Sequence, residues 1–306
     1  MNNILKAELK HKFFTTNKVE EFNVNIDNLN LKIWNRLDVL YIEVIGNNKN
    51  KDELVELLGE IFSLIFLYLG SFPNIVKIKN NDNDIDKSKL VNKFNTQEYF
   101  IKNNSVLCKI NDDTINQEKL NYFRKLNQKL IGSMEYLISD VYKSIMIEHK
   151  FTLLLHIIDG VIPDNVIKSS KEEISEKYSI NYDIGEYKPK VYYLCKNNFF
   201  DYCKRYNFKI LESLNLDEWK FIESISYTRH WYSHFLSEKS KQSRLKDTEE
   251  MVVCFEFIYY IIRVYMLKEI FKINIEEEIL KDYFYSIQNW ILQIKIDNKI
   301  KSKLYK

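Results

Sequence analysis

The sequence predicts an α+β protein, with an N-terminal mixed α/β domain (residues 1–112) followed by an all-α helical bundle (residues 113–306). Three observations support this fold class. Polar and apolar residues alternate in short segments of the first part, which is typical of half-buried strands. The later part shows helical spacing of its apolar residues over long runs. Only 3 prolines and 6 glycines occur in 306 residues, so few residues interrupt long helices.

The N-terminal domain is expected to contain five strands. The expected strands are residues 6–14, 20–26, 37–46, 74–79 and 106–110. The first two alternate between polar and apolar residues, whereas the third is a more continuous apolar run that indicates a more buried strand. The polar stretch 80–89 is expected to be a surface loop.

In residues 50–70 the spacing of the apolar residues changes from that of a strand to that of a helix. Asn50 is a plausible N-cap, since Glu53 follows three residues later, and Gly70 is a plausible C-cap. Six apolar residues between these caps form one stripe: Leu54, Leu57, Leu58, Ile61, Ile65 and Leu69. We therefore expect one helix that buries this stripe against the strands.

The second domain is expected to be a bundle of helices. Residues 113–160 predict one long helix, or two helices broken near Gly132 or Asp140. A polar stretch follows, with a short helix at 170–178. Further helices are expected at 190–207, 216–235, 249–271 and 276–297. The segment 249–271 is apolar on most faces, so we expect it to lie at the centre of the bundle.

Composition narrows the possible functions. The chain has 45 Lys and Arg against 43 Asp and Glu, a net charge of +2, so no strong overall field attracts nucleic acid. The four cysteines lack a CxxC pair, which disfavours a zinc ribbon and favours reduced thiols. The most apolar run, residues 61–70, is too short to span a bilayer, and the charged N-terminus does not resemble a signal peptide. We therefore expect a cytoplasmic protein without membrane association.

The stretch SYTRHWYSHF, residues 226–235, carries the main functional signal. His230 and His234 are two of only 5 histidines in the chain, and they lie four positions apart. Arg229 precedes them in a chain whose positive charge comes mostly from lysine. The use of arginine instead of lysine at this position indicates a need for the planar, permanently charged guanidinium.

Three interpretations of this stretch remain open. At i and i+4 on a helix, His230 and His234 could both bind zinc, but Trp231 stands where a zincin has its glutamate. The aromatic residues could instead be core residues with the histidines as polar neighbours. The third interpretation is metal-independent RNA cleavage, in which histidine moves a proton and Arg229 stabilises charge on the phosphate.

Spacing constrains the third interpretation. Arg229 and His234 are five residues apart, which is roughly 140° around an ideal helix. Their side chains would share a face only if the helix begins, ends or bends there. A second copy of the segment, packed across a two-fold axis, would also bring the two groups together.

The segment RHWYSH resembles the R-x4-H form of the R-x4-6-H motif of HEPN domains, and SISYTRHWYSHF resembles the corresponding segment of ApeA-like anti-phage defence proteins. Those proteins are similar in having an N-terminal mixed α/β domain before a C-terminal HEPN bundle. The resemblance implies a dimeric endoribonuclease that needs no metal and no cofactor. Arg229 and His234 would take the catalytic places, with His230 as their polar companion.

The resemblance also implies an RNA substrate from host or phage, with tRNA as one candidate, and a homodimer formed through the HEPN bundle. HEPN toxins that are paired with nucleotidyltransferases carry a modified tyrosine two places after the histidine. Leu236 stands there in this chain, so that form of control is not expected. A non-catalytic HEPN module that binds RNA, a nucleotide or a partner protein is the alternative.

Other residues give weaker signals. His149 and His156 are seven apart and are expected to be core histidines on one helix face. Glu148 or Glu223 is a candidate for orienting a catalytic histidine. Four basic residues after the motif could hold an RNA backbone, although a solvated charge run is the simpler expectation. These are Lys239, Lys241, Arg244 and Lys246.

Overall fold

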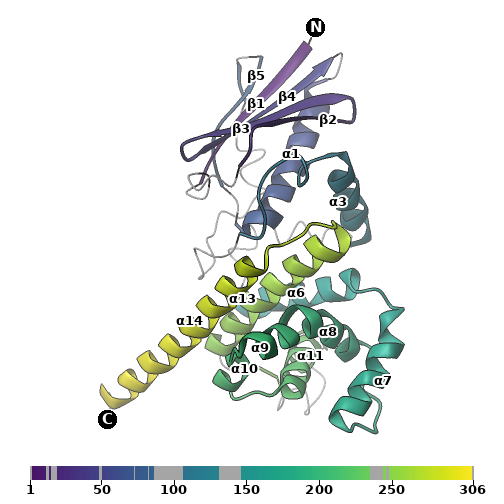
Figure 1. Cartoon of the computed structure of the whole chain (residues 1–306), viewed down its shortest axis with the longest axis vertical. Helices are drawn as coiled ribbons and strands as arrows, with labels where there is room; N and C mark the ends of the chain where they lie inside the picture. Colours follow the sequence, from purple (N-terminus) through teal and green to yellow (C-terminus); the bar gives the residue numbers. More distant parts are fainter. Residues whose placement is uncertain are drawn as a thin grey trace. The chain divides into compact units, whose positions relative to one another are not determined.

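The structure is a computed structural model of the whole chain (Figure 1). It describes residues 2–11, 14, 19–47, 50–71, 73–81, 83–85, 106–130, 146–234, 244–245 and 248–304. The chain divides into two compact units. The first comprises Met1–Ser144 and Leu267–Glu276, and the second comprises Ile145–Met266 and Glu277–Lys306.

The first unit contains an antiparallel sheet of six strands in the order β2-β3-β4-β1-β5-β6. The strands are β1 Asn2–Lys10, β2 Phe22–Ile26, β3 Leu29–Arg36, β4 Val39–Asn47, β5 Asn74–Asn80 and β6 Asn83–Asp84. The central strand β1 pairs with β4 on one side and with β5 on the other, so that Leu5 lies opposite both Val44 and Asn80. The pairing with β5 shifts register between Glu8 and Leu9.

Alternation places one side of the sheet in the core. Leu5, Ala7 and Leu9 of β1 are buried, whereas Lys6 and Lys10 between and after them are exposed. This is the pattern of a sheet with one buried face. β3 was not among the expected strands; it follows β2 through a tight turn. Asp27 and Asn28 both have positive φ in that turn, 51° and 63°, as a two-residue type I′ hairpin requires.

Helix α1, Lys51–Leu69, contacts β1 and β4. Its ends are as the sequence predicts. The side chain of Asn50 accepts a hydrogen bond from the amide of Glu53, at 2.9 Å. Gly70 has φ 78° and its amide donates to the carbonyl of Phe66, which is a conformation that favours glycine. The predicted apolar stripe is buried.

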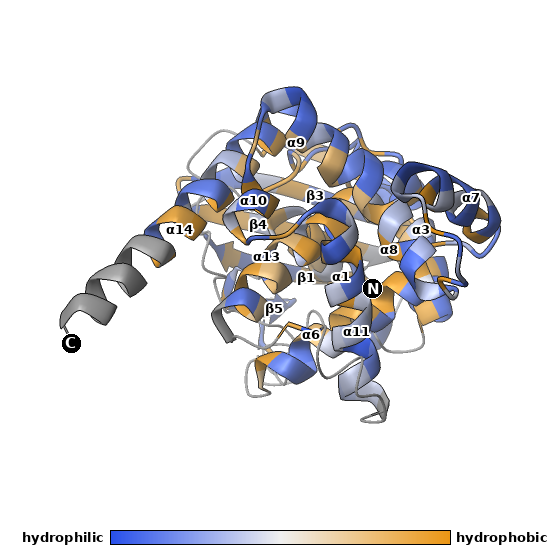
Figure 2. Cartoon of the chain, turned by 90° about the horizontal axis from the view of Figure 1, so that it is seen from below, coloured by the Kyte–Doolittle hydropathy of each residue, from blue (hydrophilic) through white to orange (hydrophobic). Residues whose placement is uncertain are grey.

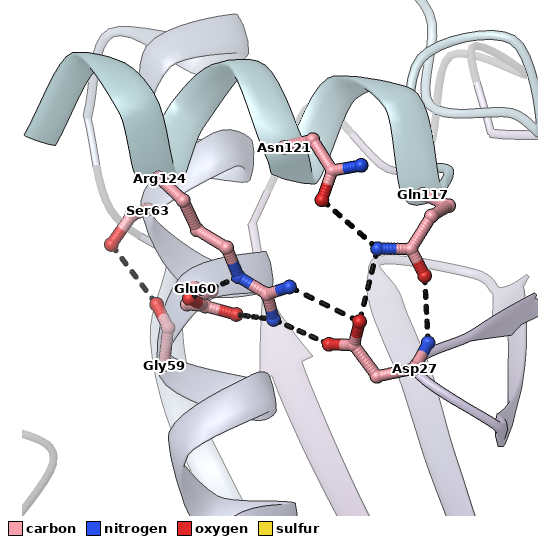
Figure 3. A network of polar contacts seen from close by, with 7 residues as sticks. All are labelled: Asp27, Gly59, Glu60, Ser63, Gln117, Asn121 and Arg124. Carbon is pink, nitrogen blue, oxygen red and sulfur yellow. Dashed lines mark hydrogen bonds and ion pairs between the residues drawn. The ribbon is translucent and has the colours of Figure 1, made fainter.

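Arg124 joins three elements of the first unit (Figure 3). It lies on α3, Gln117–Leu130. Its Nε and Nη2 donate to Glu60 of α1 at 2.8 and 2.6 Å, and its Nη1 and Nη2 donate to Asp27 at 3.2 and 2.5 Å. Gln117 adds two hydrogen bonds to the same turn residue, Asp27. These contacts fasten the β2–β3 hairpin to both helices.

The described part of the second unit is helical. Its helices are α6 Ile147–Val161, α7 Val166–Tyr178, α8 Tyr187–Cys195, α9 Asp201–Tyr206, α10 Ile210–Ser213, α11 Glu218–His234, α13 Thr248–Tyr265 and α14 Glu277–Leu304. A π-helical turn, η2 Lys196–Phe200, continues α8 into α9, and another, η3 Met266–Ile270, follows α13. Helix α7 is mostly hydrophilic, whereas α13 carries many hydrophobic residues (Figure 2).

Aromatic rings fill the core of this unit. Phe199 contacts Phe221 of α11, Phe257 of α13 and Phe284 of α14, with ring centroids 6.0, 5.1 and 5.7 Å away. All four rings are fully buried. Because α13 supplies buried residues along nearly its whole length, the expectation of a central helix is confirmed.

The α+β fold class is confirmed: a six-stranded antiparallel sheet precedes a mostly helical region. The strand expected at 106–110 is wrong, since only an isolated bridge between Ile110 and Val19 forms there. The helical run 113–160 contains α3 and α6, with residues 131–145 outside the described part. The first compact unit extends beyond residue 112, and the domain boundary expected there stays a prediction. Within the described ranges, no helix combines the length and apolarity needed to cross a membrane.

Candidate functional site

The predicted motif lies at the C-terminal end of α11. Arg229 is partly buried, with 23% of its side chain exposed, and His230 is exposed. His234 is the last described residue of α11, and its side chain lies outside the described part. Tyr227, Trp231 and Tyr232 are half-buried, so they are not the fully buried core residues of the second interpretation.

Arg229 is held by residues of two other helices. Its Nη2 donates a hydrogen bond to Oδ2 of Asp159 on α6, and this charge-assisted pair is the closest contact of the guanidinium. The guanidinium carbon also lies 4.4 Å from the ring centroid of Tyr187 on α8, a cation–π distance. Within the described residues, Nε of Arg229 is buried and has no hydrogen-bond partner. A ligand that accepts a hydrogen bond would therefore be favoured here.

Asp159 is shared by two cations. The Nζ of Lys190 on α8 lies 3.7 Å from its Oδ1 and donates to its backbone carbonyl at 3.2 Å. Lys190 also pairs with the exposed Asp164 at 2.7 Å. The positive and negative groups alternate from Arg229 to Asp164, so the charge of the Asp159 carboxylate is largely neutralised by its neighbours.

Tyr187 is fixed under the guanidinium. Its hydroxyl donates to the carbonyl of Leu155 on α6 at 2.9 Å. Burial raises the pKa of Tyr187 well above its usual value, although the charge of Arg229 opposes this shift. The phenol therefore stays neutral and keeps its hydrogen bond at physiological pH.

A second contact between the same helices lies next to this pair. Nε2 of His156 on α6 is 3.4 Å from Oγ of Ser233 on α11. His156 lies three residues before Asp159 and Ser233 lies four residues after Arg229, so both contacts belong to one line between α6 and α11. We call these four residues (His156, Asp159, Arg229 and Ser233) the α6–α11 seam.

The structure also shows the surroundings of the four weaker candidates, which are His149, His156, Glu148 and Glu223. The prediction that His149 and His156 are core histidines is wrong, because both are exposed. Glu223 pairs with Lys188 at 3.1 Å, and the Nζ of this lysine also lies 4.7 Å from the ring of Tyr227. The backbone carbonyl of Glu148 accepts a hydrogen bond from Thr152.

Of the basic residues after the motif, Lys239, Lys241 and Lys246 lie outside the described residues. The guanidinium of Arg244 is 4.6 Å from the ring of Trp231. The next residue, Leu245, is buried, and its amide donates to Oγ1 of Thr228 at 3.0 Å. The chain that leaves the motif thus returns to α11 one residue before Arg229.

The zinc interpretation gains no support from the described residues, among which no cluster of three or more His, Cys, Asp or Glu could hold a metal ion.

The four cysteines form no disulfide: Cys108, Cys195 and Cys254 are buried, and Cys203 is partly buried.

The sequence pattern indicates Arg229 as a functional residue but does not indicate Asp159, Tyr187 or Lys190. The local signal for Asp159 was its spacing from His156, which places an imidazole and a carboxylate on one helix face; Tyr187 and Lys190 on α8 had no such signal. What the seam offers chemically is a permanent cation, oriented by a carboxylate and an aromatic ring, with an imidazole one helical turn away. No family model, curated protein or solved structure matches this chain.

Proposed function

We propose that the protein is a metal-independent endoribonuclease of the HEPN type that acts in the cytoplasm in defence against phage. The observation that carries this proposal is the placement of Arg229, whose guanidinium is oriented by Asp159 and Tyr187 while part of it faces solvent. A fixed guanidinium at a surface is suited to hold a phosphodiester. The R-x4-H spacing and the helical second unit also support the proposal.

The reaction would begin with attack of the RNA 2′-oxygen on the adjacent phosphorus. In this proposal the imidazole of His234 accepts the 2′-hydroxyl proton, and Arg229 stabilises the added negative charge on the phosphorane. The bond from phosphorus to the 5′-oxygen then breaks, and the departing oxygen takes up a proton. The products are a 2′,3′-cyclic phosphate and a 5′-hydroxyl. In this proposal His230 is the polar companion of Arg229 and His234. The catalytic species would be a homodimer formed through the helical bundle. Its substrate would be host or phage RNA, with tRNA as one candidate.

The test is cleavage of total RNA by the purified full-length protein in EDTA. We expect wild type to cleave, and Arg229→Ala and His234→Ala to lose cleavage. Arg205→Ala is the matched control, because this arginine is 61% exposed and pairs with Glu277 instead of with the seam. The cleaved ends should carry a cyclic phosphate. Activity that EDTA abolishes would contradict a metal-independent mechanism.

One observation favours the second candidate, a non-catalytic HEPN module that binds RNA, a nucleotide or a partner protein. Arg229 is already ion-paired with Asp159, and such a pair can serve packing alone. The two candidates differ in one measurement. The module would bind RNA without producing new 2′,3′-cyclic ends, even in cells infected with phage, whereas the enzyme would produce them.

A further inference from the structure

His156 is an exposed histidine on the α6–α11 seam, and the proposed function has not yet assigned it a role. Its contact with Oγ of Ser233 is 3.4 Å long, at the outer limit for a hydrogen bond. His149, two turns earlier on the same helix, is also exposed. The two histidines differ in their neighbours, because only His156 lies beside the Arg229–Asp159 pair.

The position of His156 relative to Arg229 follows from helix geometry. Asp159 binds Arg229 directly, and His156 precedes Asp159 by three residues on α6. Residues with this spacing share a face, with a rise of about 4.5 Å and Cβ atoms about 5–6 Å apart. A phosphate held by Arg229 would therefore lie within about one helical turn of the His156 imidazole, which is close enough for a bound nucleotide to reach both.

Cleavage of RNA by its own 2′-hydroxyl needs two proton transfers. A base removes the proton of the attacking 2′-oxygen, and an acid must supply one to the departing 5′-oxygen, which is otherwise a very basic alkoxide. The motif supplies His234 for one transfer. Arginine stays charged at physiological pH and is a poor proton donor, so the second transfer needs another group.

We propose that His156 is the general acid of this reaction, a role that rests on the proposed ribonuclease function. The 2′-oxygen forms its bond to phosphorus while its proton passes to His234. The bond from phosphorus to the 5′-oxygen breaks, and the electron pair stays on oxygen and takes a proton from the His156 imidazolium. His234 then returns its proton to water, and His156 regains one from water, so no net proton is consumed.

The surroundings suit a proton donor. Asp159 lies three residues after His156 on the same face of α6 and is itself paired with Arg229 and Lys190. Ser233 can orient the ring through its hydroxyl. Its exposure lets the imidazole meet a substrate and exchange protons with water.

A change of leaving group tests this role directly. The substrates are two oligoribonucleotides with the same cleavage site, one natural and one with sulfur in place of the bridging 5′-oxygen. A thiol has a pKa of about 8.5, so a departing thiolate needs no proton, whereas an alkoxide does. We expect His156→Ala to slow cleavage of the oxygen substrate by about 10²–10⁴-fold. On the sulfur substrate it should cleave within about tenfold of wild type.

His149→Ala is the matched control and should cleave both substrates as wild type does. Circular dichroism verifies that both variants fold. Equal loss on both substrates would assign His156 a structural role, and full activity on the oxygen substrate would show that it takes no part; either result overturns the inference and leaves the ribonuclease function standing. Wild type that cleaves neither substrate would overturn the proposed function, and this inference with it.

Discussion

Arg229 of α11 donates a hydrogen bond to the carboxylate of Asp159 on α6, across 70 positions of sequence. Each side chain is about a quarter to a third exposed, at 23% and 34%, so the pair is neither a solvated surface bridge nor a fully buried one. Asp159 keeps one oxygen towards Lys190. The contact between these two residues thus fixes α11 to α6 at the residue most important to the proposed function.

We predict that Asp159→Asn lowers the free energy of unfolding by about 1–3 kcal/mol, between the values for exposed and buried pairs. Urea denaturation of the full chain measures this. The matched control is Asp164→Asn, which also removes a partner of Lys190 but affects a carboxylate that is 84% exposed. Its effect should stay within about 0.5 kcal/mol. A double-mutant cycle with Arg229→Gln should give a coupling energy, and additive effects would contradict the pairing.

Tyr187→Phe distinguishes the two contacts of the Tyr187 side chain, one through its hydroxyl and one through its ring. The variant loses the hydroxyl bond to the carbonyl of Leu155 but keeps an aromatic face under the guanidinium of Arg229. We expect a loss of about 1 kcal/mol in unfolding free energy. RNA cleavage should remain close to that of wild type, whereas Tyr187→Leu should impair both stability and cleavage. Equal cleavage by the two variants would show that the ring does not position Arg229.

Glu218, at the start of α11, should make stability depend on pH. Burial raises its pKa, but hydrogen bonds from Lys177, Tyr178 and Lys204 outweigh this effect and leave the pKa lowered. A carboxyl with a lowered pKa in the folded state stabilises the fold above its unfolded pKa, near 4.3. This contribution disappears as pH falls through the folded value.

Glu218→Gln should therefore be less stable than wild type by about 1–2 kcal/mol at pH 7, and the difference should shrink below about pH 4. Denaturation at a series of pH values measures both effects. A difference that is constant from pH 7 to pH 3 would mean that the charge of Glu218 is unimportant to its contacts.

The Arg124 network of the first unit should depend on the shape of the guanidinium. Arg124→Lys keeps the positive charge but cannot form the paired hydrogen bonds to Glu60 and Asp27 at the same time. We expect a loss of about 1–2 kcal/mol. Arg205→Lys, at a position that is 61% exposed, is the control and should change stability by less than about 0.5 kcal/mol. Equal effects at both positions would contradict a fastening role for Arg124.

Local structure was predictable where short-range physics decides it. Asn50 and Gly70 mark the ends of α1 because a capping side chain and a left-handed residue act within one turn. β3 could have been found as well: its burial alternates, and Asp27 and Asn28 are favourable residues for a type I′ turn. Its two asparagines, Asn30 and Asn35, which are uncommon in strands, obscured that pattern.

Contacts between distant elements could not be predicted in the same way. The sequence placed His149 and His156 on one helix face, but spacing alone does not say whether that face points inward, and they are exposed. The partners of Arg229 come from α6 and α8, and only the packing of three helices brings them together. The two π-helical turns, η2 and η3, carry no sequence signal that helical periodicity reveals.

The hydroxyl of Thr228 connects α11 to the backbone at Leu245 through hydrogen bonds. The residue has no exposed surface, and its Oγ1 donates to the carbonyl of Ser224 while accepting from the amide of Leu245. Residues 229–244, which include the whole R-x4-H motif, are therefore flanked by two residues that are hydrogen-bonded to each other. The side chain that makes this bond is buried, so RNA cannot contact it. In a genetic selection for inactive protein, substitutions at this threonine should appear beside those at the arginine that follows it, and without the structure they would be mistaken for losses of a catalytic group.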